Sequence, residues 1–481
     1  MNRFRLPFRV IAILIVTAIA WGLRARAVSM LPIDYDEDDY LRAGQQFAHL
    51  TRTSDWRGFL DTNYRTEHPP LAKIMVGISI LSAPEKPLIP DAPTTAQPNN
   101  YLPRNLVEPA RTINAVFGTL TVLALSLVNP LAGLFLAVHT FTIKYTSQIM
   151  LEALPAFLAL LSVICYTRAK KSAIPKNERF IGGWLIASAV FLGLTAASKY
   201  LYCVAGIAIL VDWFIDSKRE GNPVRFFKQA AVWGILSLLV FFMANPYLWP
   251  APFTRLKESV FYLSNYSVTA PEVQQANFPP WQPFVWLTES VPWHPGVFLI
   301  SIDFLITILA FIGLNRLWKK ERVYILWLGI AIFFLLLWPT KWPQYIVILT
   351  APLSLAAAEG FQALALDPLK AWWAARGSRK RNAESRHYEQ REGLRAIPWL
   401  MPGIIALILL AIFPLIFQFA MSLTDYSGAS LRDGFNGGVW REVWLGLSGQ
   451  VTVITQAVMG ITVAMMLHRL LDRMLVGPIN D

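Results

Sequence analysis

The apolar residues of this chain gather in long blocks separated by short charged gaps, and this pattern constrains the fold more than any other feature. Hydrophobic residues make up 55% of the 481 residues and charged residues only 15%, with a mean hydropathy of +0.43. A helix needs roughly 20 apolar residues to cross a bilayer, and the longer blocks approach that length. The sequence therefore predicts an all-α polytopic membrane protein.

The apolar blocks predict about twelve transmembrane helices, several of them shorter than a perpendicular span requires. The predicted spans are residues 8–23, 107–128, 131–145, 154–167, 180–198, 201–215, 230–244, 297–317, 323–338, 345–361, 397–422 and 451–467. No soluble carbohydrate-binding module interrupts the late loops between them.

The basic residues predict how these helices are oriented. Lys and Arg cluster near the N-terminus and in alternate gaps at 168–179, 218–228 and 316–322. The protein is expected in the plasma membrane. Because cytoplasmic loops carry an excess of Lys and Arg, its N-terminus is expected on the cytoplasmic side. Two long segments, 24–106 and 247–295, are then external. The formal net charge of +12 follows from this topology, so nucleic acid is not an expected partner.

An acidic cluster follows the first apolar block. Residues 34–40 read Asp-Tyr-Asp-Glu-Asp-Asp-Tyr and hold five carboxylates on the predicted external side. Carboxylates beside a membrane are costly, which indicates a functional site. The alternative is a solvated loop, and for Asp38 and Asp39 it is stabilisation of the N-terminus of a following helix.

A second motif lies about thirty residues later in the same external segment, where residues 67–73 read Glu-His-Pro-Pro-Leu-Ala-Lys. Two prolines fix a turn and can open a helix at its first position. His68 would then lie at the mouth of a helix, with Lys73 one turn further in. Residues 71–81 are too few to span, so an interfacial helix is expected there.

These motifs resemble those of a known family. Residues 35–41 resemble the aspartate-glutamate motif in the first external loop of GT-C type, polyprenyl-phosphate-dependent glycosyltransferases. Residues 68–73 are similar to the segment that follows it in protein O-mannosyltransferases, and less closely to that in the aminoarabinose transferases of lipid A. Further similar pieces follow in the family's order, at Arg111, Glu152, 198–200, 245–249 and 345–352. The resemblance implies a GT-C-like helical bundle whose long first external loop carries interfacial helices.

The resemblance also implies a reaction and a set of residues. A sugar passes with inversion from a polyprenyl phosphate to an external hydroxyl, with Asp36 as general base and Glu37 as its partner. The implied substrate-binding residues are His68, Lys73, Arg111, Glu152, Lys199 and Tyr345. Arg111 and Lys199 would hold the donor phosphate, since each lies at the outer end of a span.

These assignments have structural alternatives. Arg111 and Lys199 could extend to the membrane interface without binding a ligand, and Glu152 could cap a helix. Mannose transferred to a protein Ser or Thr is the implied reaction, with a glycolipid as the other acceptor. Membrane lipid is an expected partner, and no cofactor is expected. Whether the carboxylates bind a divalent cation is left open, because nothing in the sequence defines a ligand geometry.

The last part of the chain differs from the rest. Residues 366–396 are rich in Arg and Lys and predict a basic cytoplasmic linker after a glycosyltransferase membrane domain at 1–365. Residues 397–481 resemble the first two helices of sugar ABC transporter permeases, and a membrane anchor is the simplest role for them. Two other classes of function remain open for the whole chain: a multi-span transporter for a sugar or a lipid-linked substrate, and a non-catalytic scaffold.

Overall fold

The computed structural model describes residues 5–90, 102–172, 182–221, 223–291, 297–298 and 301–371. Apart from Ala371, these residues belong to one compact unit, Met1–Lys370. The predicted spans 397–422 and 451–467 lie outside the described residues, as does most of the predicted basic linker. All helices named below belong to the first unit.

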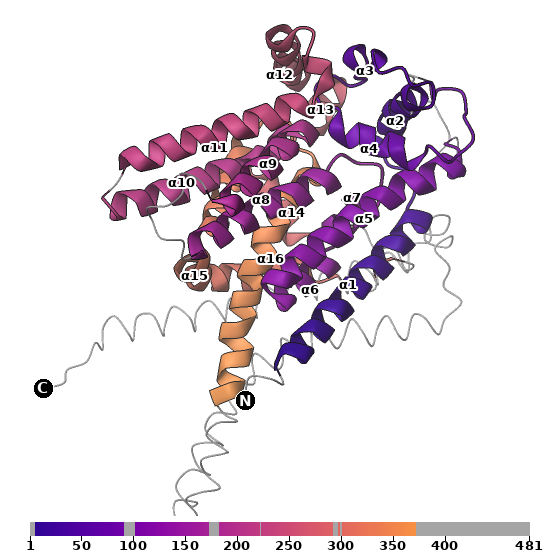
Figure 1. The fold of residues 1–481 in the computed structure, drawn as a ribbon. Coiled ribbons are helices and arrows are strands. Elements are labelled where there is room, and N and C mark those ends of the chain that lie inside the picture. The colour runs from indigo at the N-terminus through magenta and orange to yellow at the C-terminus, as the bar shows by residue number, and fades with distance from the viewer. Residues whose placement is uncertain are drawn as a thin grey trace, which may run out of the picture. The chain divides into compact units, whose positions relative to one another are not determined.

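The described residues form helices and connecting turns, without a strand among them, which confirms the predicted all-α class (Figure 1). Six helical segments are long and apolar enough to cross a membrane, so the chain is a multi-pass membrane protein. They run through α1 (Arg5–Met30), α5 (Arg104–Val128), α8 (Ala153–Lys171), α10 (Val204–Arg219), α11 (Pro223–Met243) and α16 (Val347–Phe361). The apolar helix α9 (Gly183–Ser198) is shorter.

The predicted single helix at 131–145 is wrong, because two short helices replace it. These are α6 (Pro130–Val138) and α7 (Thr140–Tyr145), separated by an extended residue, His139. The backbone N–H of Thr140 donates to the Asp303 carboxylate at 2.8 Å, and the Thr140 hydroxyl donates to the same group at 2.7 Å. Asp303 thus takes an N–H that a continuous helix would bond internally.

The long helix α15 (Asp303–Leu337) contains a kink at Glu321, whose φ and ψ of −149° and 74° are not helical. Its two arms correspond to the two spans predicted on either side of the basic gap, although the first arm starts six residues later than the predicted 297. The first arm packs tightly on α16. A Cβ added at Gly313 would lie 2.6 Å from the backbone nitrogen of Gly360, so glycine allows the two backbones to approach.

Several amphipathic and short helices gather at one end of the bundle, opposite the start of α1 and the end of α16 (Figure 1). They are α2 (Glu37–Arg52), α3 (Gly58–Asp61), α4 (Leu71–Ser79), α12 (Pro252–Thr269) and α13 (Pro271–Ala276). We call this the external end, after the predicted topology. The short helix α14 (Gln282–Thr288) lies deeper in the bundle and packs on α15 (Figure 1). α2 and α4 pack through Gly44 and Gly77, where a Cβ at Gly77 would lie 2.8 Å from the Gly44 carbonyl oxygen.

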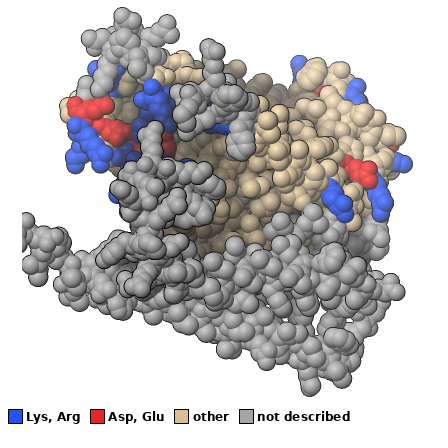
Figure 2. All heavy atoms as spheres, turned by 90° about the horizontal axis from the view of Figure 1, so that it is seen from below, with Lys and Arg blue, Asp and Glu red and all other residues tan. Residues whose placement is uncertain are grey.

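The charged side chains are distributed as a membrane protein requires. Figure 2 shows one face on which Lys, Arg, Asp and Glu gather toward two opposite edges, with a broad surface of other residues between them. Large apolar side chains are exposed along the spans, among them Leu14, Ile235, Leu239, Phe311 and Phe333. In water such surface would be unfavourable, whereas lipid tails are as apolar as these side chains.

Candidate active site at the external end

Asp36 lies at the start of α2, as the residue before Glu37. Its carboxylate does not cap the helix, and its one described hydrogen bond is a long one, in which Gln344 Nε2 donates to Asp36 Oδ2 at 3.4 Å. The side chain is half-buried. Asp36 therefore presents a carboxylate that the surrounding structure holds only weakly.

The environment of Asp36 disfavours its negative charge. Burial is the largest cause, followed by repulsion from Asp34, and together with weaker repulsion from Glu152 they raise the pKa of Asp36 to about 7, although Lys199 opposes the shift. A carboxylate with a pKa near the working pH is suited to act as a general base. This property distinguishes Asp36 from an ordinary solvated loop acid.

Glu37, the next residue, is fully buried and fully paired. Arg111 Nε and Nη2 donate to its two oxygens at 2.7 and 2.5 Å, the backbone N–H of Ile149 donates at 2.7 Å and that of Asp34 at 2.8 Å. Four donors satisfy the carboxylate, so Glu37 connects the acidic loop to α5 and to the segment before α8.

Arg111 has the matching arrangement from the other side. Besides Glu37, its guanidinium donates to the carbonyl oxygens of Val28, Leu31 and Pro32 at 2.8 to 3.0 Å, and the side chain is buried. All its N–H groups thus face the end of α1 and the start of the acidic loop. Arg111 neither extends to the membrane interface nor presents an N–H to a ligand in this structure.

Lys199 and Glu152 form a second buried ion pair. Lys199 lies in the extended turn between α9 and a short 3-10 helix (Tyr200–Cys203), while Glu152 directly precedes α8. The ammonium also lies over the Tyr345 ring, 5.5 Å from its centroid. Burial alone would lower the pKa of Lys199, but Glu152 and Tyr345 outweigh it and raise that pKa above its usual value.

Glu152 uses only one of its two oxygens for Lys199. Its Oε2 is buried and accepts no hydrogen bond, and the side chain makes no cap to its own helix. Burying a carboxylate oxygen without a hydrogen-bond donor costs free energy. This atom is therefore suited to accept a hydrogen bond from a hydroxyl of a bound molecule. The alternative that Glu152 merely caps α8 is not what the structure has.

The two basic residues of the proline motif differ in what they face. Lys73 is fully buried and donates to the carbonyl oxygens of Tyr64, Arg65 and His68 at 2.8 to 2.9 Å, so its ammonium closes the loop that precedes α4. The His68 ring lies beside Tyr40, with centroids 6.2 Å apart. Burial and the charges of Lys199 and Lys73 lower the pKa of His68 well below its usual value, so its imidazole is neutral at pH 7.

The structure therefore brings Asp36, His68, Glu152, Lys199 and Tyr345 to one place at the external end. Their electrostatic influence on one another reports this proximity, since Lys199 acts on both Asp36 and His68 and Glu152 acts on Asp36. Glu37, Lys73 and Arg111 border the same place but direct their polar groups into the protein.

Sequence reasoning missed several residues of this place. Gln344 contacts Asp36, and Lys144 pairs with Asp34 at 2.7 Å. Asp39 accepts hydrogen bonds from the Tyr64 hydroxyl and from Arg65 Nε, both at 2.8 Å, which fastens α2 to the loop before the proline motif. Gln344 had one available signal: it is a polar residue at the outer mouth of a late span, next to Tyr345.

The carboxylates do not form a recognisable metal site. Within the described residues no group of three or more His, Cys, Asp or Glu side chains is arranged to hold a metal ion. Asp36 has acidic neighbours in Asp34 and Glu152, but Asp34 pairs with Lys144 and Glu152 with Lys199. Side-chain ammonium groups thus already neutralise both of these neighbours.

Fold and site together define a multi-span membrane protein with an ionisable cluster at one mouth of its bundle. No protein-family model and no curated protein sequence matches the chain. Similar solved structures include ArnT from Cupriavidus metallidurans in the apo state, at a TM-score of 0.48 and 14% identity over 74% of this chain and 61% of that one. Another is the same protein bound to undecaprenyl phosphate, at a TM-score of 0.45 and 15% identity over 76% and 61%. The chain thus spans about 61% of the solved chains' length, and likeness of this degree does not extend to substrates.

Proposed function

We propose that this protein transfers a sugar from a polyprenyl-phosphate donor to an external hydroxyl acceptor, with Asp36 as the general base. The observation that carries the proposal is the meeting of a weakly held carboxylate of raised pKa with a buried lysine at the external end. Such a pair matches the two demands of the reaction, which are removal of a proton and stabilisation of a leaving phosphate.

The proposed transfer is a single displacement at the anomeric carbon. The acceptor hydroxyl gives its proton to an Asp36 oxygen, and its own oxygen forms the new bond to the anomeric carbon of the sugar. The bond from that carbon to the phosphate oxygen breaks, and its electron pair leaves with the phosphate. Attack and departure occur on opposite faces, so the configuration inverts.

Lys199 is the cation that we assign to the leaving phosphate, because its charge already acts on Asp36. The phosphate would compete with Glu152 for the Lys199 ammonium. The free Oε2 of Glu152 would accept a hydrogen bond from a sugar hydroxyl. Gln344 and the neutral His68 would orient the acceptor or the sugar. Glu37, Lys73 and Arg111 become positioning residues that hold the acidic loop and the proline-motif loop.

Mannose as the sugar and a protein Ser or Thr as the acceptor rest on the motif at residues 68–73, with a glycolipid acceptor as the alternative. The experiment uses purified full-length protein in liposomes, with dolichyl- or undecaprenyl-phosphate mannose and a Ser/Thr-rich peptide. The mannose of the donor is radiolabelled, and we expect the label to pass from the lipid to the peptide. Release of intact donor to the opposite leaflet without transfer to any acceptor would instead favour a transporter.

The raised pKa of Asp36 predicts a pH dependence. A general base must be ionised, and an aspartate with a pKa of about 7 is mostly protonated below that pH. Transfer should therefore increase about tenfold per pH unit below pH 7 and level off above it. Initial rates at subsaturating donor, measured from pH 5 to 9, test this increase and the plateau above it.

His68 provides one control for this assignment, since the ordinary pKa of an imidazole lies near the raised pKa of Asp36. Its imidazole is already neutral at pH 7, so a His68→Gln variant should keep the same midpoint even if its rate is lower. A midpoint that disappears in His68→Gln would contradict Asp36 as the titrating base.

A further inference from the structure

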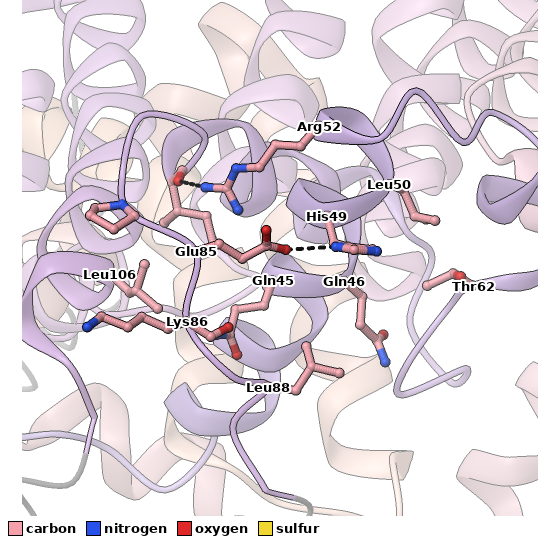
Figure 3. A pocket seen from close by; sticks show the side chains of 12 residues that line it. Gln45, Gln46, His49, Leu50, Arg52, Thr62, Glu85, Lys86, Leu88 and Leu106 are labelled. Carbon is pink, nitrogen blue, oxygen red and sulfur yellow. Dashed lines mark hydrogen bonds and ion pairs between the residues drawn. The ribbon is translucent and has the colours of Figure 1, made fainter.

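A pocket apart from this cluster lies at the external end, between the C-terminal half of α2 and the segment 80–89 that follows α4 (Figure 3). We call it the α2 pocket. Its volume of about 380 Å³ lies in the range of small-molecule sites. The residues that line it are Gln45, Gln46, His49, Leu50, Arg52, Thr62, Ile80, Pro84, Glu85, Lys86, Leu88 and Leu106.

The walls of the α2 pocket are firmly built. Four polar side chains on one face of α2, spaced i, i+3, i+7 and i+10, bond to the segment 80–89. Arg42 donates to the Ile89 carbonyl at 2.5 Å, Gln45 to that of Pro87 at 3.0 Å, His49 pairs with Glu85 at 2.7 Å, and Arg52 donates to the carbonyls of Ile80 and Ala83 at 2.8 Å. A site whose walls are already held loses little entropy when a ligand binds.

The α2 pocket is separate from the proposed active site. His49 lies thirteen residues after Asp36 along the same helix, which places it roughly 20 Å away at 1.5 Å per residue. Gln45, the lining residue of α2 that is nearest to Asp36 in sequence, is still about 14 Å away along the helix, so a head group in the pocket is too far to present a hydroxyl to Asp36. Its role is therefore different from that of donor and acceptor in the proposed reaction.

The polar lining favours an anion that also carries hydroxyl groups. Arg52 and Lys86 form no ion pair with a described residue, while the one lining carboxylate, Glu85, is paired with His49. Neither cation thus has an ion-pair partner among the described residues, although the charge of Arg52 also acts on Glu85. Gln46 Oε1 is buried and accepts no hydrogen bond, which costs free energy. A ligand O–H or N–H that donates to this atom would supply the missing hydrogen bond.

The apolar lining places the pocket at the membrane surface. Leu106 belongs to the first turn of α5, whose span begins at Arg104, so the pocket lies at the depth of the outer head groups. Leu50 and Ile80 line the same cavity, and Leu88 beside them is 49% exposed. A ligand with an anionic, hydroxylated head and an apolar tail would match both halves of the lining.

We propose that the α2 pocket binds an anionic phospholipid of the outer leaflet with a hydroxylated head group, of the phosphatidylglycerol type. Lys86 and Arg52 attract the phosphate, Gln46 Oε1 accepts a head-group hydroxyl, and the leucines contact the start of the acyl chains. Basic pockets beside membrane spans are suited to such head groups. The polyprenyl-phosphate donor shares this chemistry, and its distance from Asp36 in this pocket is the reason to assign the site to a phospholipid instead.

Native mass spectrometry of the delipidated full-length protein tests this assignment with phosphatidylglycerol, phosphatidylethanolamine and polyprenyl phosphate as probes. We expect one phosphatidylglycerol to be retained, and retention to drop about five- to tenfold in Lys86→Gln and in Gln46→Leu. Lys257→Gln removes an exposed lysine of the external helix α12 and should leave retention unchanged.

Three results would overturn the proposal. They are equal retention in wild type and Lys86→Gln, equal retention of phosphatidylethanolamine, and displacement of phosphatidylglycerol by polyprenyl phosphate. The last would assign the pocket to the donor. Because binding is measured without turnover, the outcome is independent of whether sugar transfer is the correct function.

Discussion

Replacing Asp36 by asparagine should lower the rate of sugar transfer by about 10²–10⁴-fold, the weight of a general base, while donor binding persists. The fold should not suffer. The amide would keep the shape of the carboxylate, and the substitution removes a charge that Asp34 and Glu152 repel. The thermal midpoint of D36N is therefore expected to equal or exceed that of the wild type. Initial rates at saturating donor, with the midpoint measured in the same detergent, test both expectations.

Asp61→Asn is the matched control for this variant. Asp61 is also an acid of the first external segment, but its side chain is 76% exposed and pairs with Arg255 at 3.0 Å. Loss of such a surface pair costs little, about 0–1 kcal/mol, so D61N should transfer sugar nearly as fast as wild type. A D36N protein as active as D61N would remove Asp36 from the mechanism.

The neighbouring substitution Glu37→Gln should have the opposite effect on stability. It leaves the guanidinium of Arg111 buried without a counter-charge, and breaking a buried ion pair from one side costs about 3–5 kcal/mol. The free energy of unfolding should decrease by this amount, and activity should decrease with it because the acidic loop loses its anchor. Thermal unfolding in detergent, followed by tryptophan fluorescence, provides the measurement.

Two further variants show whether the loss comes from the pair itself. Combining Glu37→Gln with Arg111→Gln should cost less than the sum of the single losses, because the second change removes the uncompensated charge. Asp39→Asn, which loosens the partly exposed pair with Arg65, should cost only about 1 kcal/mol. Strictly additive losses at positions 37 and 111 would show that the two side chains do not stabilise each other.

Asp36 and Glu37 illustrate what sequence reasoning could and could not reach. The acidic run indicated a site, and the family resemblance singled out the two carboxylates together. Nothing in the run itself distinguishes them. Their difference arises because Ile149 and Arg111, distant in sequence, surround Glu37 on both sides, whereas Asp36 meets only the long contact from Gln344.

The basic residues also differ from one another in ways that the sequence does not record. Arg111 and Lys199 were expected to face a substrate because each lies at the outer end of a predicted span, and Lys73 because it belongs to the proline motif. In the structure Arg111 and Lys73 direct their N–H groups to backbone carbonyls of the loops that they hold. Position along a span predicts the depth of a charge, but not the direction in which its side chain extends.

The sequence by itself determined the class of this protein and most of its spans within the described residues, and it predicted their orientation. Apolar block length and charge alternation carry that information locally, because a bilayer acts on each segment separately. Only the tertiary structure decided that α6 and α7 are separate helices, that Arg111 neutralises Glu37 and that Asp36 has a pKa of about 7. Those properties depend on desolvation and on partners from distant segments, and no local pattern records which segments will meet.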